Sequence, residues 1–503
     1  MFEPLLHALP IVFQPMNLLA MIAGVAMGIA IGALPGLSAT MGIAVLIPLT
    51  FGLDPLVGLG MMAGIYNGAM YGGAIPAVLL RIPGTPASIV TTFDGHAMAK
   101  KGEAGRALQI AVVSSAIGGM ASAVALMAFA PPLSRVTLAF GPAEYFWVGV
   151  FGLSSISVFL GKSPIKGILS ACMGLMIGMV GIDQITGGQR FTFGTVNLVD
   201  GFHIVVLLTG LYALPPAIGM AEEAIKTGIS SAELKIGKSR HIFSDWRILW
   251  RTWVRSSGLG ILVGLLPGAG GNIAAFLSYN EAKRASKHPE TFGHGAPEGV
   301  AAGECGNNAD NSAALVPALT LGVPGSSVAA VILGGLLIHG LRPGPALFRD
   351  HADIVYGFMI QMFATSFLLI VIGGFLGAKV FVHLLRLPRV MLVPLIVGLT
   401  AVGVYSINNN MFDLYMMFAF GMLGYAMERL DFPLAPAVLG LILGSMSEEN
   451  MRLALLISQG DWTVFFTRPI SLTIAILTAV VLLFPVVRTI RDRRREAREA
   501  ATA

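Results

Sequence analysis

A cluster of polar residues lies inside a long apolar region between Ala302 and Ser327, where the chain reads AGECGNNADNSAALVPALTLGVPGSS. At the centre of a membrane-spanning helix, an ionisable side chain costs about 2.5–3.5 kcal/mol. Backbone groups that a Pro-Gly break leaves unpaired cost several kcal/mol each unless protein or water bonds to them. The cluster therefore indicates polar groups that line a cavity within a membrane and bind something there. The alternative is an ordinary spanning helix whose Asn and Ser side chains only bond neighbouring helices.

Composition agrees with a membrane location for the whole chain. Of the 503 residues, 55% are hydrophobic and 12% are charged, and apolar runs of about 18 or more residues recur throughout, as spanning helices require. The net charge of +5 comes from Lys and Arg in the segments between these runs, where basic residues set orientation rather than bind nucleic acid. The sequence therefore predicts an all-α polytopic membrane protein with no nucleic-acid partner.

The same sequence pattern occurs twice. The segment NGAMYGGAIPAVLLRIPGTPAS begins at Asn67, and a shift of 241 positions superposes it on the segment that begins at Asn308. Upstream, GALPG from Gly32 matches GLLPG from Gly264 at a shift of 232. Apolar segments interrupted by Gly and Pro at matching places in two halves are the best sequence indication of a transporter binding site. We therefore expect two membrane repeats, each with a broken helix and a re-entrant hairpin.

Four parts are expected along the chain, with roughly 11 transmembrane helices and two hairpins in total. They are a first membrane repeat over 1–219 with a hairpin near 56–98, a linker over 220–256, a second repeat over 257–488 with a hairpin near 298–340, and a basic tail over 489–503.

Charge in the loops predicts the orientation of these parts. Seven basic residues between Lys226 and Arg255, and the tail RDRRREAREA, place the linker and the C-terminus in the cytoplasm by the positive-inside rule. The N-terminus is then expected outside, in the periplasm. An odd number of crossings in the first repeat makes the two hairpins enter from opposite sides. Such an inverted-topology repeat places a shared site near the middle of the membrane.

The hairpin tips have residues suited to binding an anion. Pro and Gly end a helix there, Ser or Thr after the break caps a new one, and the N-terminus of that helix favours a carboxylate. The alternative for the hydroxyl residues is helix capping without a ligand. The predicted substrate-binding residues are Ser38, Thr40, Asn67, Thr85, Ser88, Asn272, Ser326 and Ser327.

A group of side-chain oxygens in the second repeat suits a hard cation such as Na⁺. Asp310 would supply its single negative charge or act as a proton relay, and the alternative is a salt bridge to a basic residue in another span. Glu304 is expected closer to the outer surface. The predicted cation-coupling residues are Asn67, Asn307, Asn308, Asp310 and Asn311.

Enzyme motifs are not evident in the sequence. The PGAGGN segment after Leu266 has the glycine density of a phosphate loop but lacks its Gly-Lys-Ser/Thr ending. His294 and Glu298 do not have a zinc-binding spacing. We therefore expect no catalytic residue, no cofactor, and no metal beyond a transported Na⁺, and uphill work must come from an ion gradient.

Long motifs in this order resemble those of a known family. IGALPGLSATMGIAVLIPLTFGLDP and GIYNGAMYGGAIPAVLLRIPGTPASIVTTFDGHAMAKKGEAGRAL, with their second-half counterparts, resemble the large membrane subunit (TctA) of the tripartite tricarboxylate transporters over roughly residues 18–440. The resemblance implies a bacterial inner-membrane protein that works with a small membrane subunit (TctB-like) and a periplasmic solute-binding protein (TctC-like). It further implies uptake of citrate-like di- or tricarboxylates, or related organic acids, by symport with Na⁺ or H⁺. The alternative is a carboxylate or anion channel, or a carrier that needs no binding protein.

Overall fold

The structure is a computed structural model that describes residues 2–34, 36–159, 163–183, 186–227, 245–381 and 389–483. This described part is all-α apart from two short paired strands, β1 (Gly181–Ile182) and β2 (Gln189–Arg190). Contacts within the chain separate two compact units. Unit 1 consists of Met1–Arg135, His203–Thr320 and Pro324–Ala426, and unit 2 of Val136–Phe202, Leu321–Val323 and Met427–Ala503.

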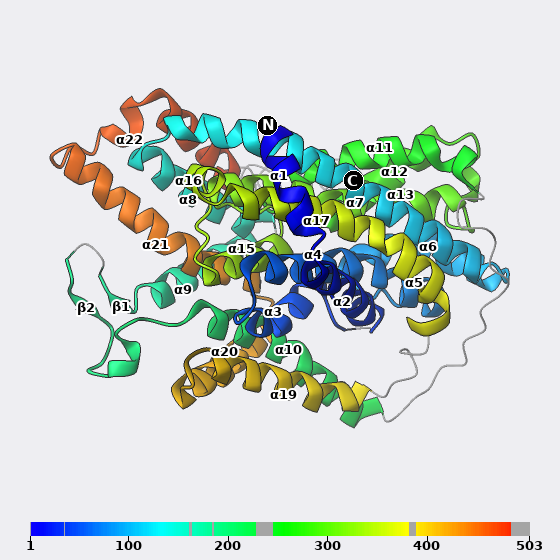
Figure 1. Ribbon diagram of the computed structural model, residues 1–503, viewed down its shortest axis with the longest axis horizontal. Helices are drawn as coiled ribbons and strands as arrows, with labels where there is room; N and C mark the ends of the chain where they lie inside the picture. Colours follow the sequence, from blue (N-terminus) through cyan, green and yellow to red (C-terminus); the bar gives the residue numbers. More distant parts are fainter. Residues whose placement is uncertain are drawn as a thin grey trace, which may run out of the picture. The chain divides into compact units, whose positions relative to one another are not determined.

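In the first half of unit 1, a helix ends at Ala33 and the next begins at Ala39, which is the break that the GALPG motif predicts. After this break, Ser38 caps the next helix, because its Oγ accepts a hydrogen bond from Met41 N at 3.1 Å. The helices of this half are α1 (Phe2–Val12), α2 (Pro15–Ala33), α3 (Ala39–Thr50), α4 (Pro55–Gly72), α5 (Ala74–Leu80), η1 (Pro86–Ser88), α6 (Ile89–Lys100) and α7 (Ala104–Val136). Helix α2 lies against α4 (Figure 1).

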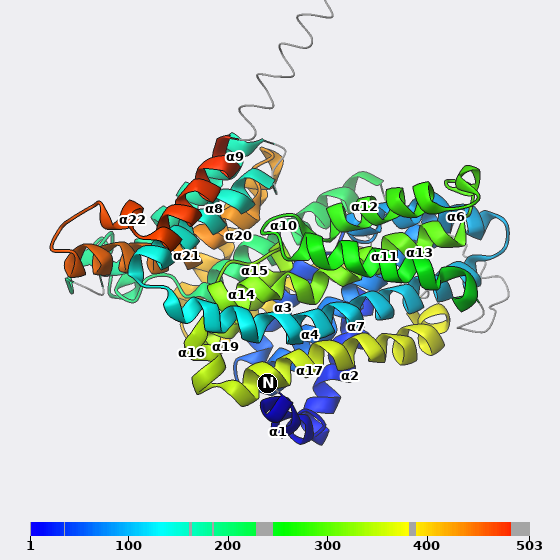
Figure 2. The ribbon, with the colours of Figure 1, turned by 90° about the horizontal axis from the view of Figure 1, so that it is seen from above.

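The second half of unit 1 repeats these helix bounds at the two sequence shifts. Shifted by 232, α2 falls on α11, and shifted by 241, α4 and α5 fall on α13 and α14. Helices α11, α12 and α13 lie side by side (Figure 2). The elements are α11 (Trp246–Gly264), α12 (Gly270–Ala285), η4 (Pro289–Thr291), α13 (Pro297–Ala313), α14 (Leu315–Leu321), α15 (Ser327–Ile338), α16 (Pro345–Asp350), α17 (Ala352–Leu369) and its π-helical continuation η5 (Ile370–Phe381).

Each half has a second helix break that the sequence pattern did not lead us to expect. It separates α4 from α5 at Gly73 and α13 from α14 at Ala314. Pro76 and Pro317 lie three residues further on in the two halves. A proline ring clashes with the carbonyl four residues before it and removes one hydrogen-bond donor, so the helix cannot continue regularly through this point.

The tip of the first hairpin packs back onto this second break. Gly84 N donates a hydrogen bond to Gly73 O at 3.2 Å. A Cβ atom at Gly84 would lie 2.2 Å from Gly32 O at the end of α2, which is too close for any side chain. Three elements therefore meet at one point. The second half repeats both contacts, between Gly325 N and Ala314 O at 3.0 Å and between a Cβ at Gly325 and Gly264 O at 2.6 Å.

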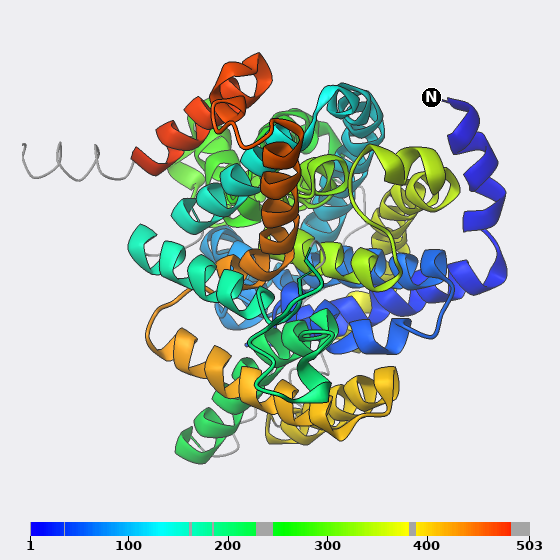
Figure 3. The same ribbon diagram turned by 90° about the vertical axis from the view of Figure 1, so that its left-hand side faces the viewer.

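The remaining helices complete the two units. In unit 1, α10 packs against α3 and α19, and in unit 2, α21 packs against α8 and α9; α21 is the orange helix on the side that Figure 3 turns toward the viewer. Small residues allow the close approach in unit 2, because a Cβ at Gly174 would lie 1.8 Å from Ala437 O. These helices are α8 (Pro142–Phe159), α9 (Pro164–Gly178), α10 (Ile204–Thr227), α19 (Arg389–Asn408), α20 (Met411–Arg429), α21 (Leu434–Ile457) and α22 (Val464–Thr467).

Five helices in the described part are long and apolar enough to cross a membrane, and several shorter apolar helices accompany them. Large apolar side chains such as Leu262 and Leu266 are exposed, as expected where lipid is the neighbour. The fold is therefore that of a multi-pass membrane protein, while the expected total of about eleven crossings stays a prediction. Helices α10 and α11 extend into the expected linker 220–256, and its residues 228–244 and the tail 489–503 lie outside the described residues.

Candidate functional site

Three asparagines from α4 and α13 form the centre of the candidate site. Asn311 Nδ2 donates hydrogen bonds to Asn67 Oδ1 at 3.0 Å and to Asn308 Oδ1 at 3.3 Å, and all three side chains are fully buried. Asn67 and Asn308 match one another in the repeat, so the structure brings together two predicted residues that are far apart in the sequence.

Helix α17 holds Asn67 from the other side. The Asn67 amide nitrogen lies within hydrogen-bonding distance of Met362 O, Thr365 Oγ1 and Ser366 Oγ, at 3.2, 2.9 and 3.0 Å. Because an amide nitrogen carries two hydrogens, these acceptors use its donor capacity fully. Asn67 therefore positions α4 against α17. The sequence analysis did not identify Thr365 and Ser366, although two adjacent polar side chains in an apolar helix could have indicated them.

The carboxylate of Asp310 is buried and unpaired. Its side chain has no exposed surface, and neither oxygen has a hydrogen-bond partner in the described part of the chain. Its Oδ1 lies 3.1 Å from the position of a Cβ at Gly264, the last residue of α11. No basic residue in the described ranges pairs with it, so the structure offers no support for a structural salt bridge. The carboxylate faces a helix C-terminus, which carries a partial negative charge.

Two hydroxyl groups, one on α4 and one at the second hairpin tip, lie close to each other. Tyr66 Oη lies 3.4 Å from Ser326 Oγ. Ser326 also caps α15 by accepting a hydrogen bond from Ala329 N at 3.2 Å. Ser326 thus caps a helix, while its contact with a substrate stays a prediction. The sequence analysis did not identify Tyr66, whose match in the repeat is Asn307.

Asn307 is the second buried group without a partner. Both polar atoms of its side chain lack a hydrogen bond within the described residues, and the side chain is fully buried. Its Oδ1 lies 2.4 Å from the position of a Cβ at Gly271, in the first turn of α12. The residue before α12, Ala269, provides no side-chain cap. An amide with unused hydrogen-bonding capacity therefore lies at an uncapped helix N-terminus.

The first hairpin tip has two buried hydroxyls. Thr85 Oγ1 and Ser88 Oγ are 2.7 Å apart and hydrogen-bonded, and the short helix η1 that ends at Ser88 packs against α12. Of the other predicted substrate residues, Thr40 and Ser327 are half-buried and Asn272 is exposed, and their side chains make no hydrogen bond within the described part of the chain. The structure therefore assembles the predicted residues only in part.

Glu304, which we expected closer to the outer surface of the membrane, is fully buried within the protein on α13. Its carboxylate accepts hydrogen bonds from Thr91 Oγ1 on α6 and, at 2.9 Å, from Ser115 Oγ on α7. Asn308 Nδ2 donates to Glu304 O at 3.0 Å. The hydrogen bonds to both oxygens distinguish this carboxylate from that of Asp310, and they join three helices.

Asp94 is a buried carboxylate that the sequence analysis missed. Its Oδ1 accepts hydrogen bonds from the backbone N–H groups of Gly293, Gly295 and Ala296, each at 2.8 Å, and its Oδ2 accepts one from Tyr279 Oη at 2.9 Å. Several N–H donors around one carboxylate form a strong, charge-assisted contact. Asp94 on α6 therefore holds the loop that leads into α13.

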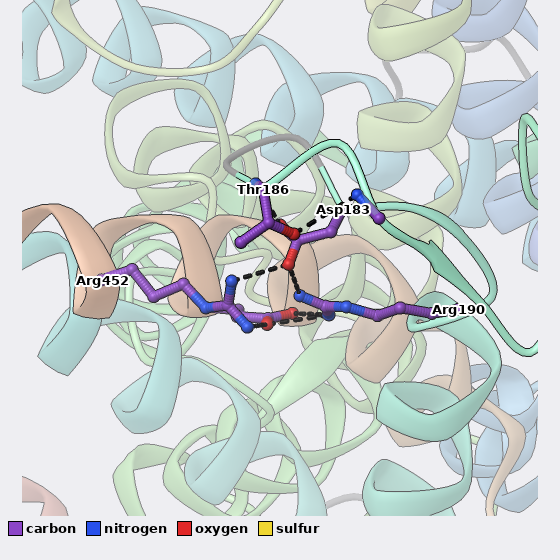
Figure 4. A network of polar contacts seen from close by, with 6 residues as sticks. Asp183, Thr186, Arg190 and Arg452 are labelled. Carbon is purple, nitrogen blue, oxygen red and sulfur yellow. Dashed lines mark hydrogen bonds and ion pairs between the residues drawn. The ribbon is translucent and has the colours of Figure 1, made fainter.

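Unit 2 contains an ion-pair network around its two strands (Figure 4). Asp183 Oδ2 pairs with Arg190 on β2 and, at 2.7 Å, with Arg452 on α21. Both arginines also contact Glu448, at 2.9 and 2.8 Å. The network ties the loop after α9 to α21 and lies outside unit 1, which contains the asparagine centre. In the described ranges, no group of three or more His, Cys, Asp or Glu residues could hold a metal ion.

Apolar helices, matched breaks and buried unpaired polar groups define a multi-pass membrane protein of the transporter class. The chain belongs to the tripartite tricarboxylate transporter TctA family, whose model matches residues 18–439. The resemblance seen in the sequence is thereby confirmed. This is a family of transporters and not of enzymes, and as a tripartite family it implies TctB and TctC partners and a carboxylate substrate.

Two similar proteins come from Agrobacterium vitis. The chain is 38% identical over 487 residues to an "Uncharacterized 52.8 kDa protein in TAR-I ttuC' 3'region". The matched region covers 95% of this chain and 95% of the relative. The chain is 40% identical over 238 residues to an "Uncharacterized protein in TAR-II ttuC' 3'region", which covers 46% of this chain and 98% of the relative. No solved structure matches the chain.

Proposed function

We propose that this protein takes up di- or tricarboxylates by symport with Na⁺ or H⁺. In this proposal it receives the substrate from a periplasmic solute-binding protein and works beside a small membrane subunit in a bacterial inner membrane. The observation that carries the proposal is the buried, unpaired carboxylate of Asp310, which extends from α13 toward the C-terminal end of α11.

A cation would resolve the electrostatic imbalance around Asp310. A buried ion without a partner costs several kcal/mol, and a bound Na⁺ or proton removes that cost. The C-terminal end of α11 adds backbone carbonyls and a negative dipole end, and both favour a cation. Ser326 follows Gly325, which packs against the end of α11, and the Ser326 hydroxyl lies 3.4 Å from that of Tyr66. Hard cations prefer oxygen ligands of this kind.

The charge of the substrate explains why a cation is needed. Moving an anion into the negative interior of a cell is opposed by roughly 2.3 kcal/mol per charge for each 100 mV of membrane potential. Co-transported cations cancel this term. A carboxylate transporter of this kind therefore needs a cation site close to its substrate site, and Asp310 lies on the same helix as Asn307, Asn308 and Asn311.

The proposed architecture is two inverted-topology repeats within the four predicted parts of the chain. The matching helix bounds, the two sets of tip contacts and the bridge between Asn67 and Asn308 support it. The tip residues Thr85, Ser88 and Ser326 remain our candidates for contact with the substrate. Hairpins that enter from opposite sides would meet near the middle of the membrane.

The proposed orientation has the linker and the tail in the cytoplasm and the N-terminus in the periplasm. At the start of α11, Trp246 and Trp250 are exposed, and the guanidinium groups of Arg247 and Arg251 lie 5.8 and 5.3 Å from the centres of their rings. Aromatic and basic residues at one helix end are typical of a membrane–water interface on the cytoplasmic side. This feature supports the orientation that the loop charges predict.

Uptake into proteoliposomes tests the proposal. The wild type should accumulate a carboxylate such as citrate, succinate or tartrate when a Na⁺ or H⁺ gradient and the binding protein are both present. Asp310→Asn should abolish accumulation and cation dependence while the protein still folds, whereas Asp353→Asn, at an exposed position, should transport normally. Unchanged cation dependence in Asp310→Asn would contradict the role of this residue. Flux that neither saturates nor needs a binding protein would indicate the channel alternative instead.

A further inference from the structure

The two halves place different side chains at matching positions around the tips. At the shift of 241 positions, Tyr66 matches Asn307, Ala69 matches Asp310, and Met70 matches Asn311. Helix α4 thus provides a phenol, a methyl group and a thioether where α13 provides an amide, a carboxylate and a second amide. The repeated backbone therefore surrounds two chemically different sites, of which only one has a negative charge.

The backbone contacts at these positions are equivalent, so the difference lies in the side chains. A Cβ at Gly32 would lie 2.2 Å from Ala69 O, and a Cβ at Gly264 would lie 2.8 Å from Asp310 O. Each broken helix thus ends against the same point of its repeat. At that point Asp310 has a carboxylate and Ala69 has none.

Asn307 has unused hydrogen-bonding capacity next to α12. Its side chain is fully buried, and both its Nδ2 and its Oδ1 lack a partner among the described residues. The position of a Cβ at Gly271 lies 2.4 Å from Asn307 Oδ1 and 3.3 Å from Met70 Cε. Buried amides in native proteins are nearly always hydrogen-bonded, so a bound group is the natural partner of this one.

The N-terminus of α12 is open to an anion, unlike its match in the first half. Ser38 caps α3, whereas the position that matches Ser38 in the second half is Gly270, the first residue of α12, with φ +67. Ala269, the residue before α12, supplies no cap. The first turn of a helix has unpaired N–H groups and a partial positive charge, which together favour a carboxylate.

We propose that Asn307 and the N-terminus of α12 bind one carboxylate group of the transported substrate, while Asp310 binds the cation one helical turn away. The assignment rests on the proposed function and names the subsites within it. Asn307 Nδ2 donates to the carboxylate together with the N–H groups of the first turn of α12. The absence of a side chain at Gly271 lets the Asn307 side chain approach this end of the helix. Asn307 thus belongs with the substrate, although its sequence context suggested a cation ligand. Residues three apart on a helix are neighbours, so the anion and the cation stabilise each other when both are bound.

Two substitutions of almost equal size test the assignment by binding measurements on the purified full-length chain. Asn307→Asp places a negative charge where the substrate carboxylate should lie, so citrate or succinate affinity should fall at least tenfold. Na⁺ affinity, measured with Na⁺ alone by calorimetry, should stay the same or rise, because the added negative charge lies three residues from Asp310. Asp310→Asn should do the reverse and lower Na⁺ affinity at least tenfold. Asn410→Asp is the matched control, because this residue caps a helix away from the site by accepting a hydrogen bond from Phe412 N, and it should change neither affinity.

The double variant Asn307→Asp/Asp310→Asn keeps the net charge and moves it by one turn. If the two subsites are distinct, this swap restores neither citrate nor Na⁺ binding. Recovery of both would show that only the total charge matters and would overturn the assignment.

A second variant covers the case in which Asn307→Asp does not fold. Asn307→Ala removes the amide without adding a charge, and it should lower citrate affinity at least fivefold. Unchanged citrate affinity in a folded Asn307 variant overturns the assignment but leaves the proposed symport intact. Wild-type protein that binds none of citrate, succinate and tartrate would overturn the proposed function itself.

Discussion

Asn311 Nδ2 donates a hydrogen bond to Asn67 Oδ1 at 3.0 Å, across a separation of 244 residues in the sequence. The same nitrogen reaches Asn308 Oδ1 at 3.3 Å, so one amide bridges the two asparagines that the repeat superposes. Buried side-chain hydrogen bonds of this kind require both partners at fixed positions, because an unpaired buried amide is costly. The bridge therefore fixes how α4 and α13 meet.

Replacing Asn67 should destabilise the whole of unit 1. Asn67→Ala leaves the hydroxyls of Thr365 and Ser366 without their donor and Asn311 without one acceptor. We expect a loss of about 1–3 kcal/mol, seen as a lower thermal unfolding temperature in detergent or nanodiscs. The control is Thr473→Ala, which removes an exposed hydroxyl that donates only to Pro469 O, four residues earlier in the chain. Equal unfolding temperatures for both variants would contradict a positioning role for Asn67.

The two hairpin tips should be equally intolerant of a methyl group. In Gly84→Ala and Gly325→Ala the new Cβ would lie 2.2 and 2.6 Å from a backbone oxygen, and overpacking of this kind costs about 1–3 kcal/mol or more. We expect reduced folded yield or a lower unfolding temperature for each. Gly258→Ala is the control, because nothing lies within 4 Å of a Cβ at that exposed helical position. Normal stability of either tip variant would show that the close contact is absent in solution.

Glu304 and Asp310 should respond differently to loss of charge. Both oxygens of Glu304 accept hydroxyl hydrogen bonds. In Glu304→Gln one oxygen remains, and a hydroxyl can turn to accept from the new amide. We therefore expect Glu304→Gln to keep its cation dependence in uptake assays, in contrast to Asp310→Asn. Loss of that dependence in both variants would assign a coupling role to Glu304 as well.

Asp94 should control the order of the loop before α13. Asp94→Asn replaces one acceptor oxygen with an NH₂ group and removes the charge that three backbone N–H groups contact. We expect a loss of about 1–3 kcal/mol and faster amide hydrogen exchange at Gly293, Gly295 and Ala296. Glu290→Gln, on the same loop but exposed, should leave exchange at these amides unchanged. Equal exchange rates in both variants would contradict the role of Asp94.

The sequence predicted the membrane class, the family and the helix breaks at the GALPG and GLLPG motifs, because hydropathy and Pro-Gly pairs act locally. It also predicted that Asn67 and Asn308 belong to one site, since the repeat superposes them. The breaks at Gly73 and Ala314 were missed, although Pro76 and Pro317 indicate them through the carbonyl four residues earlier.

Other parts of the site could not be predicted, because they depend on contacts between distant segments. Asp94 stands in a sequence of no special pattern, and its partners begin at Tyr279. The difference between Glu304 and Asp310 was also hidden. Both are acids in one buried helix, and only the neighbouring helices decide that the first has two hydroxyl partners and the second has none.

The contact between Gly84, Gly73 and Gly32 has a mechanical consequence. The tip packs directly against the backbone of two other segments, so it cannot move far while they stay in place. Opening it alone would break the hydrogen bond from Gly84 N and leave the buried Gly73 O unpaired. Any rearrangement that exposes the site to one side of the membrane must therefore carry the end of α2, the break after α4 and the tip together as one rigid block.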